Sequence, residues 1–562
     1  MPSFNLVDEP WIPCLELDAA GAPTTREYSL RDTLHRAHQL TALAGESPPV
    51  TVSLCRLLLA IVHRSCGPDG TTRPADAEDW AALWQAGRFD AAAIDRYLDG
   101  QRPNFDLFDE RRPFFQTAAP AVDRSKAISM AKLLFQSDNN PLLWDHHYAS
   151  NPPSVSPAQA ARLVVAFQAF DTAGLITGTG AEKSAKAGPL LQAAVLVVRG
   201  KNLFETLMLN LHRYSPEDGQ PWDFDRANDH PAWEREGDVL PAERYPGGYL
   251  DLLTWQSRRM RLWTQVDAAG QTVVQHATVM KGFQIPVDWS RVGRETMIAF
   301  IPRFKPQPGQ DPNPPLGFRE DRALWRDSVA LFESQGTIAA RPKTFSWLGV
   351  LGSEDIISPS QQLSVDAYGL AADRAKLLFW RHERVALPLA YLSDDPEKGG
   401  MLRAELRSAL RLAEDVGRLL SGGYIEVQLA DKSAKFSSPM RSLAQELLGT
   451  KGNLGQLIDH LASSPVYWAA IETPFRRFLI ELPSDTSEED GAVTYGAVQW
   501  RLWREALRAA ATTAFKRATE GLDQSAAGLR AVSLAERELN FRLYQLLGNP
   551  TRERSAAGAA RR

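Results

Sequence analysis

The segment from Leu402 to Val416 reads Leu-Arg-Ala-Glu-Leu-Arg-Ser-Ala-Leu-Arg-Leu-Ala-Glu-Asp-Val, and it decides how the second part of the chain folds. Its apolar residues recur on one helix face: Leu402, Leu406, Leu410, Ala413 and Val416. This spacing predicts an amphipathic helix. Similar patterns predict further helices over four stretches: 439–448, 466–479, 493–519 and 531–546. Long amphipathic helices with short connections favour an antiparallel bundle of four main helices.

Outward from this segment, the composition changes near residue 393. We therefore expect an α+β protein with a mixed α/β N-terminal domain over residues 1–390 and an all-α four-helix bundle over 391–548. Residues 549–562 are small, polar and basic, which predicts a disordered tail.

Several segments of the N-terminal domain have a pattern of their own. We expect a Ser29-capped helix over 28–37, an apolar helix over 52–64 and an amphipathic helix over 80–98. We also expect a strand over 193–198, a segment of strand character over 249–262 and an alternating or helical segment over 370–380.

Bulk properties exclude several classes of protein. The chain has 562 residues, too many for one core, and 44% hydrophobic with 23% charged residues is typical of an ordinary globular protein. A net charge of −5 argues against a free-standing, non-specific DNA binder but leaves room for a local basic groove. Three widely spaced cysteines predict neither a disulfide framework nor a structural zinc site. No secretory signal or membrane span is visible, so we expect a cytoplasmic protein.

The stretch from Gly174 to Pro189 carries Gly174, Gly178 and Gly180 within seven residues, followed by Lys183 and Lys186. Glycines let a backbone approach another molecule closely, and the lysines could face phosphates. The stretch is not a Walker A loop, because Glu182 precedes Lys183-Ser184. It is not a dinucleotide fingerprint either, because lysine occupies position 183 where the third glycine is required. A surface loop without a ligand is the alternative.

Four strings in order resemble one family: Phe4-Asn5-Leu6-Val7-Asp8-Glu9-Pro10-Trp11-Ile12-Pro13, Phe108-Asp109-Glu110-Arg111-Arg112-Pro113-Phe114-Phe115-Gln116, Thr254-Trp255-Gln256-Ser257-Arg258-Arg259 and residues 369–380. They are similar to strings of the CasA family, the large subunit of the type I-E CRISPR surveillance complex, Cascade. The resemblance implies a mixed α/β domain followed by a four-helix bundle. It also implies a subunit that recognises the protospacer-adjacent motif (PAM) in duplex DNA, promotes strand opening (R-loop formation) and recruits the helicase–nuclease.

The resemblance assigns DNA contacts to three segments. Gly178 and Gly180 match a glycine loop that enters the minor groove. Lys281 matches a lysine that reads the minor groove from a hairpin, although an ordinary surface lysine fits as well. Asp373, Arg374 and Ala375 match a wedge that starts strand separation, with Arg374 where the family has glutamine. Arg374 as a solvated charge on a helix is the alternative.

The resemblance also assigns residues 137–148 to a loop that contacts the guide RNA (crRNA) and neighbouring subunits. Its contact residues are Asn139, Asn140, Trp144 and His146, although Trp144 also suits a core. We assign no metal to Asp145-His146-His147, because no third ligand follows at helical or hairpin spacing.

In the bundle, Arg501, Arg504 and Arg508 lie on one helix face and form either a phosphate track or a solvated surface. No catalytic motif stands out, so we expect a binding subunit without an enzymatic activity or cofactor. Its partners are crRNA, double-stranded target DNA, the other Cascade subunits and the helicase–nuclease, with no membrane. Two rival interpretations are a nucleotide-dependent enzyme that uses the loop at 174–188 and a helical scaffold without DNA contact.

Overall fold

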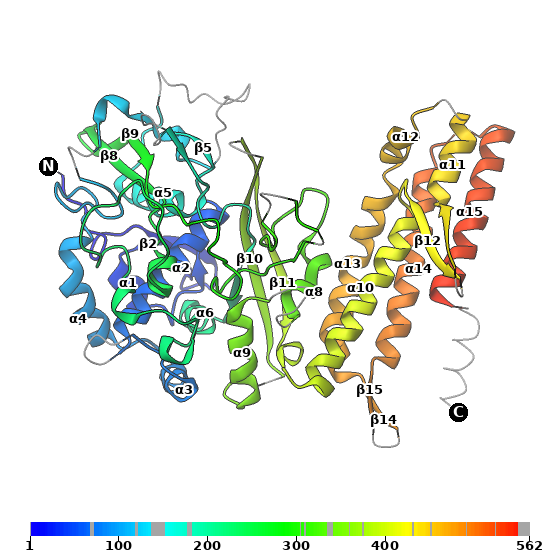
Figure 1. Cartoon of the computed structure of the whole chain (residues 1–562), viewed down its shortest axis with the longest axis horizontal. Helices are drawn as coiled ribbons and strands as arrows, with labels where there is room; N and C mark the ends of the chain where they lie inside the picture. Colours follow the sequence, from blue (N-terminus) through cyan, green and yellow to red (C-terminus); the bar gives the residue numbers. More distant parts are fainter. Residues whose placement is uncertain are drawn as a thin grey trace. The chain divides into compact units, whose positions relative to one another are not determined.

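The computed structural model divides into two units, Met1–Val385 and Ala386–Arg562 (Figure 1). The expected boundary at residue 390 falls in the short helix η9 (Leu389–Leu392) of the second unit. The structure describes residues 2–67, 72–118, 122–135, 152–176, 183–303, 305–307, 311–333, 341–358, 360–373, 376–429, 432–449, 452–489, 492–522 and 524–548.

Helix α2 (Pro48–Ser65) lies at the centre of the first unit, and every residue in it except Arg64 is buried. A helix that is apolar on all sides needs neighbours on all sides. Helices α5 and α6 and strand β10 pack against it. The helices of this unit are α1 (Leu30–His35), α2, α3 (Ala77–Gln85), α4 (Ala91–Gln101), α5 (Pro157–Phe170), α6 (Leu203–Asn210), α7 (Tyr249–Leu253), α8 (Ser328–Phe332) and α9 (Lys343–Ser353).

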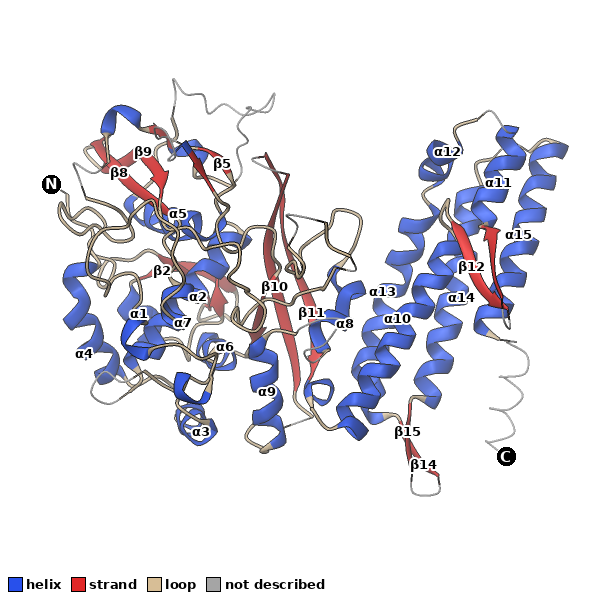
Figure 2. Ribbon diagram, in the orientation of Figure 1, coloured by secondary structure: helices blue, strands red, loops and turns tan. Residues whose placement is uncertain are grey.

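The described strands of the first unit form small sheets with the orders β2-β1-β3, β11-β10-β7, β4-β9-β8 and β5-β6 (Figure 2). They are β1 (Ile12–Leu17), β2 (Pro23–Tyr28), β3 (Ala42–Leu43), β4 (Ile128–Ser129), β5 (Gly174–Leu175), β6 (Ser184–Ala185), β7 (Val195–Arg199), β8 (Arg258–Val266), β9 (Thr272–Lys281), β10 (Gln362–Asp373) and β11 (Lys376–Pro388). In Figures 1 and 2, strand β5, the β8–β9 hairpin and the tip between β10 and β11 lie along the same side of this unit.

Asp366 on β10 joins the three strands of one of these sheets. His382 and Arg384 on β11 contact it at 3.0 and 2.7 Å, and Arg199 on β7 lies 3.6 Å away. Burial raises the pKa of Asp366, but the hydrogen bonds from His382 and Arg384 outweigh burial and lower this pKa to about 2. The carboxylate is therefore charged at neutral pH and fixes the register between the hairpin and β7.

Sequence patterns predicted part of this unit correctly. The Ser29-capped helix is α1, the apolar helix is α2, and the strand expected at 193–198 is β7. Residues 80–98 form two helices, α3 and α4, instead of one. The strand character expected over 249–262 is wrong at its start, where α7 forms, and the helical alternative for 370–380 is wrong, because β10 and β11 occupy this segment.

The second unit consists mainly of long helices: α10 (Met401–Leu419), α11 (Pro439–Leu448), α12 (Leu454–Leu461), α13 (Ser463–Glu481), α14 (Ala497–Thr519) and α15 (Ala526–Leu547). All five apolar residues that predicted α10 are buried. The indole N–H of Trp503 donates to the Ala409 carbonyl at 3.1 Å, and the Tyr467 hydroxyl donates to the Ala413 carbonyl at 2.9 Å. These bonds tie α14 and α13 to α10.

The all-α expectation for this unit is wrong at two places. A hairpin of β12 (Tyr424–Leu429) and β13 (Lys432–Ser437) lies between α10 and α11. A second hairpin of β14 (Thr486–Glu489) and β15 (Ala492–Tyr495) precedes α14, which therefore begins at residue 497 and not at 493. Strand β12 reads Tyr-Ile-Glu-Val-Gln-Leu, an alternation that favours a strand and that the all-α expectation overlooked. Strands β14 and β15 have four residues each, which is too short for a clear period.

Candidate nucleic-acid interface

The glycine-rich stretch closes a short hairpin. Strand β5 pairs with β6, and the Ile176 N–H donates to the Lys183 carbonyl at 2.9 Å, so the chain leaves and returns at one place. Gly174 has a φ of 145°, a conformation that residues with a side chain rarely adopt. Gly178 and Gly180 lie outside the described residues. We call the two segments that meet here, residues 171–176 and 183–188, the loop neck.

Arg258, the first residue of β8, holds this neck together from inside the protein. Its side chain is fully buried, and its Nε donates to Asp171 Oδ2 at 2.5 Å. Its Nη2 donates to the Thr172 carbonyl at 3.1 Å and to the Lys186 carbonyl at 2.9 Å. One guanidinium therefore binds the chain before the loop and the chain after it. The planar fork of arginine suits such a multiple contact.

Gly188 allows the returning chain to pack against the end of α5. Its N–H donates to the Asp171 carbonyl at 2.8 Å. A Cβ at this position would lie 2.5 Å from the Ala169 carbonyl oxygen, closer than two unbonded atoms approach. The neck is thus closed by a buried cation on one side and by backbone contact on the other.

The two lysines of the loop have different surroundings. Lys186 is half-buried, and its Nζ lies 2.6 Å from Glu243 Oε1 and 3.0 Å from the Ile285 carbonyl. Its N–H also donates to Gln284 Oε1 at 2.6 Å. Lys183 is exposed, and within the described residues its side chain has no recorded partner. Lys183 is therefore the better placed of the two for a phosphate.

Lys281 lies beside the same neck. It ends β9 and pairs with Arg258 across the β8–β9 hairpin, and its carbonyl accepts a bond of 2.9 Å from Arg259 Nε. The next residue, Gly282, packs against the Arg258 backbone, where a Cβ would lie 2.7 Å from the Arg258 nitrogen. Arg258 thus joins the predicted lysine and the predicted glycine loop: its backbone contacts one and its side chain contacts the other.

Of the predicted wedge, the structure describes only Asp373. Asp373 is exposed and ends β10, while Arg374 and Ala375 lie outside the described residues. Gln192, which follows the loop neck, donates from its N–H to the Leu370 carbonyl at 3.0 Å and from its side chain to the Ala372 carbonyl at 2.8 Å. Gln192 is six positions after Lys186, a span of at most about 21 Å. Gln192 therefore ties the end of β10, which leads to the wedge, to the chain that leaves the loop neck.

Other predicted contacts are not part of this cluster. The guide-RNA loop residues Asn139, Asn140, Trp144 and His146 lie outside the described residues. In the second unit, Arg501 lies 3.9 Å from Glu505, the Arg504 guanidinium lies over the Trp500 ring at 5.6 Å, and Arg508 donates to the Gly548 carbonyl at 2.7 Å. Each arginine of the proposed track thus has a partner within its own unit.

Two observations concern metal sites and membrane spans. Within the described ranges, no group of three or more histidine, cysteine, aspartate or glutamate side chains is placed to hold a metal ion. None of the helices in the described part of the chain is both long and apolar enough to cross a membrane. All three cysteines are free, and burial raises the pKa of each thiol to about 12.

Sequence reasoning missed the central role of Arg258. The sequence shows three arginines close together in one strand, Arg258, Arg259 and Arg261, which suggests a surface cluster. Burial of Arg258 depends on Asp171, 87 positions away, and the sequence gives no signal that these residues meet.

Comparisons with known proteins place the chain among CRISPR-associated proteins. The family model of CRISPR-associated protein Cse1 matches residues 5–514. The CasA/Cse1 protein of Thermus thermophilus is 31% identical over 98% of this chain and 99% of its own length. The chain belongs to the CasA/Cse1 family, which confirms the resemblance seen in the sequence.

Solved structures agree with this assignment. The crystal structure of Thermus thermophilus CasA matches with a TM-score of 0.74 at 28% identity, covering 97% of this chain and all of the other. Thermobifida fusca Cse1 matches with a TM-score of 0.77 at 23% identity, covering 97% and 98%. A chain of a CRISPR RNA-guided surveillance complex matches with a TM-score of 0.71 at 22% identity, covering 96% and 100%. These last two matches support the fold.

Proposed function

We propose that this chain is a non-catalytic subunit of a cytoplasmic RNA-guided DNA surveillance complex. In this proposal it reads the PAM in duplex DNA, starts strand opening and recruits the helicase–nuclease. Its partners are crRNA, double-stranded target DNA and the other Cascade subunits. Membership of the CasA/Cse1 family supports the assignment, as does the likeness in fold to a chain of an RNA-guided surveillance complex.

One observation carries the proposal: three segments with separate predicted roles are tied to one another. Arg258 binds both sides of the loop neck and pairs with Lys281, and Gln192 binds the strand that leads to the wedge. A reader of the minor groove and a strand-separating wedge must act within the same turn of the duplex. A span of at most about 21 Å from Lys186 to Gln192 is shorter than one turn of B-DNA, about 34 Å.

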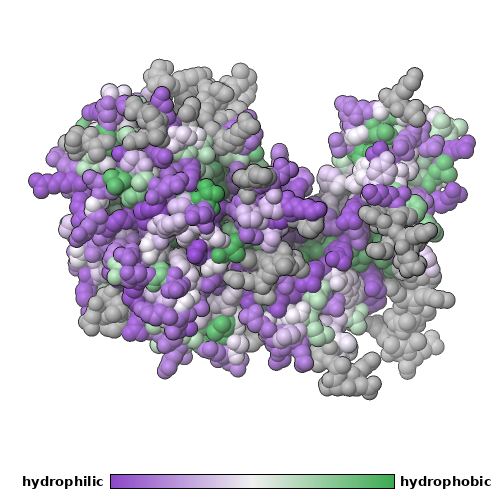
Figure 3. Space-filling model, viewed as in Figure 1, coloured by the Kyte–Doolittle hydropathy of each residue, from purple (hydrophilic) through white to green (hydrophobic). Residues whose placement is uncertain are grey.

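The physical chemistry of the minor groove supports the glycine loop as the reader. The groove is about 6 Å wide and presents few distinguishing groups, so contact depends on close approach of a narrow backbone. A neck closed by Arg258 lets the tip enter without loss of position. The exposed Lys183 adds a positive charge beside it. On the face shown in Figure 3, hydrophobic side chains form small separate patches among hydrophilic ones.

Strand β11 extends the proposed wedge with a surface for the opened strand. Its residues alternate in exposure from Lys376 onward, and Leu378 and Trp380 are 53% and 43% exposed. Unstacking a base step costs a few kcal/mol, and an aromatic ring that stacks on a freed base recovers about 1–3 kcal/mol. We propose that Arg374 enters the duplex and that Trp380 receives a base of the displaced strand.

Duplex binding by the reconstituted complex tests the loop. Gly178→Phe and Gly180→Phe should weaken binding to a duplex with the cognate PAM and leave thermal unfolding unchanged. Gly100→Leu is the control, because Gly100 faces open space. Equal affinity in the loop variants, or equal binding of cognate and scrambled duplexes by the wild-type complex, would reject the role.

Opening kinetics test the wedge separately. With 2-aminopurine beside the PAM, Arg374→Ala should slow the fluorescence rise more than it weakens initial binding. Trp380→Ala should lower the stability of the opened state, and Trp380→Phe should restore most of it because a ring remains. Opening that proceeds at the wild-type rate and to the wild-type extent in both alanine variants would refute this part of the proposal.

For the second unit, we propose that α10, α13, α14 and α15 form the four-helix bundle of the family and that Arg501, Arg504 and Arg508 follow a phosphate backbone. The pair between Arg501 and Glu505 is weak, since an exposed pair four residues apart on a helix contributes about 0.3–0.5 kcal/mol. Neutralising the three side chains should reduce the salt dependence of DNA binding by about 0.9 in log–log slope per phosphate lost. An unaltered slope would assign them to the surface alone.

The nucleotide-enzyme interpretation can rely on only one of the two lysines. Lys186 is engaged by Glu243 and by the Ile285 carbonyl, whereas Lys183, which directly precedes Ser184, is exposed. The carboxylate of Glu182 next to Lys183 would repel phosphate, which disfavours this interpretation. Nucleoside triphosphate hydrolysis by the isolated chain would favour that enzyme. Assembly of a complex whose DNA affinity does not depend on this subunit would favour a scaffold.

A further inference from the structure

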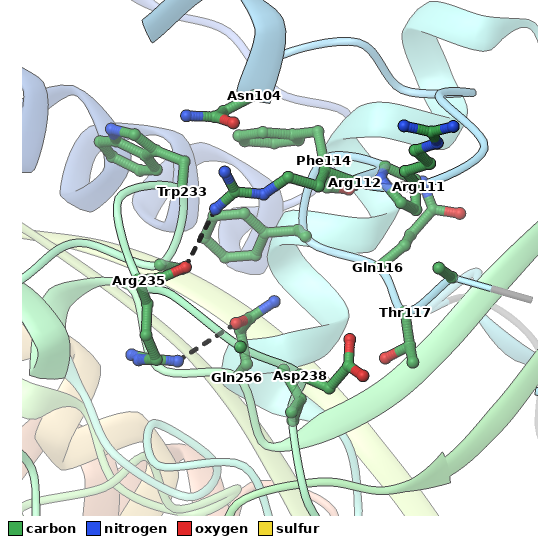
Figure 4. A pocket seen from close by; sticks show the side chains of 16 residues that line it. Asn104, Arg111, Arg112, Phe114, Gln116, Thr117, Trp233, Arg235, Asp238 and Gln256 are labelled. Atoms are coloured by element: carbon green, nitrogen blue, oxygen red, sulfur yellow. Dashed lines mark hydrogen bonds between the residues drawn. The ribbon is translucent and has the colours of Figure 1, made fainter. Parts of the chain in front are cut away.

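A second site is a pocket of about 280 Å³ in the first unit, lined by residues other than those of the loop neck and wedge (Figure 4). It lies between the segment 111–118, the segment 232–239 and Gln256. Its volume is slightly below the range of about 300–1,000 Å³ that drug-sized ligands occupy. In Figure 4 the side chains of Thr117 and Asp238 lie at one end, Asn104 and Trp233 at the other, and Arg112 and Gln256 between them.

The backbone beside the pocket is strained. Phe115 has a φ of 55°, which is a left-handed conformation that a bulky residue adopts at a cost of about 1–3 kcal/mol. Gln116 fixes this turn, because its side-chain nitrogen donates to the Leu107 carbonyl at 2.7 Å and its side-chain oxygen accepts from the Leu262 N–H at 2.8 Å. The turn aims Thr117 into the pocket. Strain held in place by buried hydrogen bonds is typical of binding sites.

Two buried side chains that line the pocket each have one polar atom without a recorded hydrogen bond in the described part of the chain. Thr117 is 3% exposed, and its Oγ1 has no hydrogen bond within the described residues. Gln256 is 5% exposed; its Oε1 accepts from Arg235 at 3.3 Å, and its amide nitrogen has no recorded bond among those residues. A buried polar group without a partner costs about 1–3 kcal/mol. Groups of this kind point to a ligand that supplies the missing bonds.

Charges at the pocket differ between its parts. Among the described residues, Arg111 and Arg112 have no recorded carboxylate partner, and Arg112 donates to the Arg235 carbonyl at 3.1 Å. Arg235 and Arg244 share the single carboxylate of Asp251. Asp238 carries the one carboxylate that lines the pocket. An anionic group is favoured beside the arginines, and a group with hydrogen-bond donors is favoured beside Asp238.

We propose that this pocket binds one unpaired nucleotide, with its phosphate beside Arg112 and its base edge against Thr117, Asp238 and Gln256. A hydroxyl, a carboxylate and an amide supply the donors and acceptors that read the Watson–Crick edge of an extruded base. The nucleotide must be unpaired, because a base in a duplex does not expose this edge. The inference rests on the proposed function only in that the chain works beside nucleic acid.

Binding of nucleoside 5′-monophosphates to the purified full chain tests the proposal. Titration of the four ribonucleotides and the four deoxyribonucleotides, followed by tryptophan fluorescence and calorimetry, should show saturable binding of at least one base. A preference for the ribose or the deoxyribose series identifies RNA or DNA as the source. Inorganic phosphate is the reference probe. If it binds as tightly as every nucleotide, the base-reading end is refuted.

Matched variants locate the binding. Asp238→Asn should weaken the preferred nucleotide at least tenfold, and Asp223→Asn, a change at another exposed carboxylate, should leave the affinity unchanged. Thr117→Val should also weaken binding tenfold while the unfolding temperature stays equal or rises, because it removes a buried hydroxyl that has no recorded partner among the described residues. No saturable binding by any nucleotide, or equal binding by both pocket variants, would overturn the inference. Because these measurements need no DNA target or PAM, their failure is distinct from failure of the proposed function.

Discussion

Replacement of Arg258 tests how the glycine loop is held. Arg258→Met keeps most of the volume of the side-chain stem but removes the guanidinium that binds Asp171, Thr172 and Lys186. Asp171 is 9% exposed, so the substitution leaves a buried carboxylate without its cation. Breaking a buried pair in this way costs about 3–5 kcal/mol. We take about 4 kcal/mol as the expected loss, against a total stability of about 5–15 kcal/mol for a protein.

Hydrogen exchange followed by mass spectrometry measures this loss where it arises. At about 1.4 kcal/mol per factor of ten, a loss of 4 kcal/mol lowers protection about 1,000-fold. The effect should appear in peptides covering residues 171–176 and 183–188. The control Arg88→Met changes an exposed arginine and should alter stability by less than about 0.5 kcal/mol.

A double-mutant cycle with Asp171→Asn isolates the pair itself. Because the two residues are in contact, the combined variant should lose at least about 1.5 kcal/mol less than the sum of the single losses. The reasoning is refuted if Arg258→Met costs under about 1 kcal/mol and the two substitutions add. In that case the neck would be held by its backbone hydrogen bonds and not by the buried guanidinium.

Two further predictions concern stability. Gly188→Ala should lower the free energy of unfolding by about 1–3 kcal/mol, because the added Cβ meets the Ala169 carbonyl. Gly100→Ala, in open space on α4, should raise the free energy of unfolding by up to about 1 kcal/mol. Denaturant titration measures both changes, and equal effects would contradict the prediction. Burial lowers the pKa of His63 to about 3 and of His212 to about 4, so the unfolded chain binds their protons first and stability should fall as the pH drops below 6.5. Burial raises the pKa of Asp229 to about 6, so the folded chain keeps one proton more at this group between pH 6 and 4, which opposes the loss. The free energy of unfolding should then fall by about 1.4 kcal/mol per pH unit in this range. A free energy of unfolding that does not change with pH would show that the histidines are not buried and neutral.

Sequence periodicity predicted the elements whose burial follows one regular pattern. Helix α10 has five apolar residues on one face, and all five are buried. For residues 370–380 the same reasoning left an alternating and a helical segment open, because Leu377, Leu378, Phe379 and Trp380 are consecutive and apolar, although their exposure alternates in the fold. A pattern of hydrophobicity reports a strand only if its exposed face is polar. The exposed apolar residues of β11 break this condition.

Parts of the candidate interface were predicted on different grounds. The glycines and lysines of the loop stand out in the sequence because their chemistry is local: backbone freedom and positive charge. The contact between Arg258 and Asp171 does not stand out in the sequence, because the two residues are 87 positions apart and only the packing of β8 against α5 brings them together. Gln168 shows the same limit, since its side chain bonds the backbone N–H and carbonyl of Arg258 at 2.8 and 2.9 Å.

The way Arg258 holds the loop has a consequence for protein engineering. Two of its three contacts at the neck are to carbonyl groups, which every amino acid carries. The anchorage therefore does not depend on which side chains occupy residues 177–182, and this six-residue segment can be exchanged. In the proposed function, libraries randomised at these positions, or loop segments taken from related proteins, offer a route to surveillance complexes with an altered PAM preference while the rest of the protein stays unchanged.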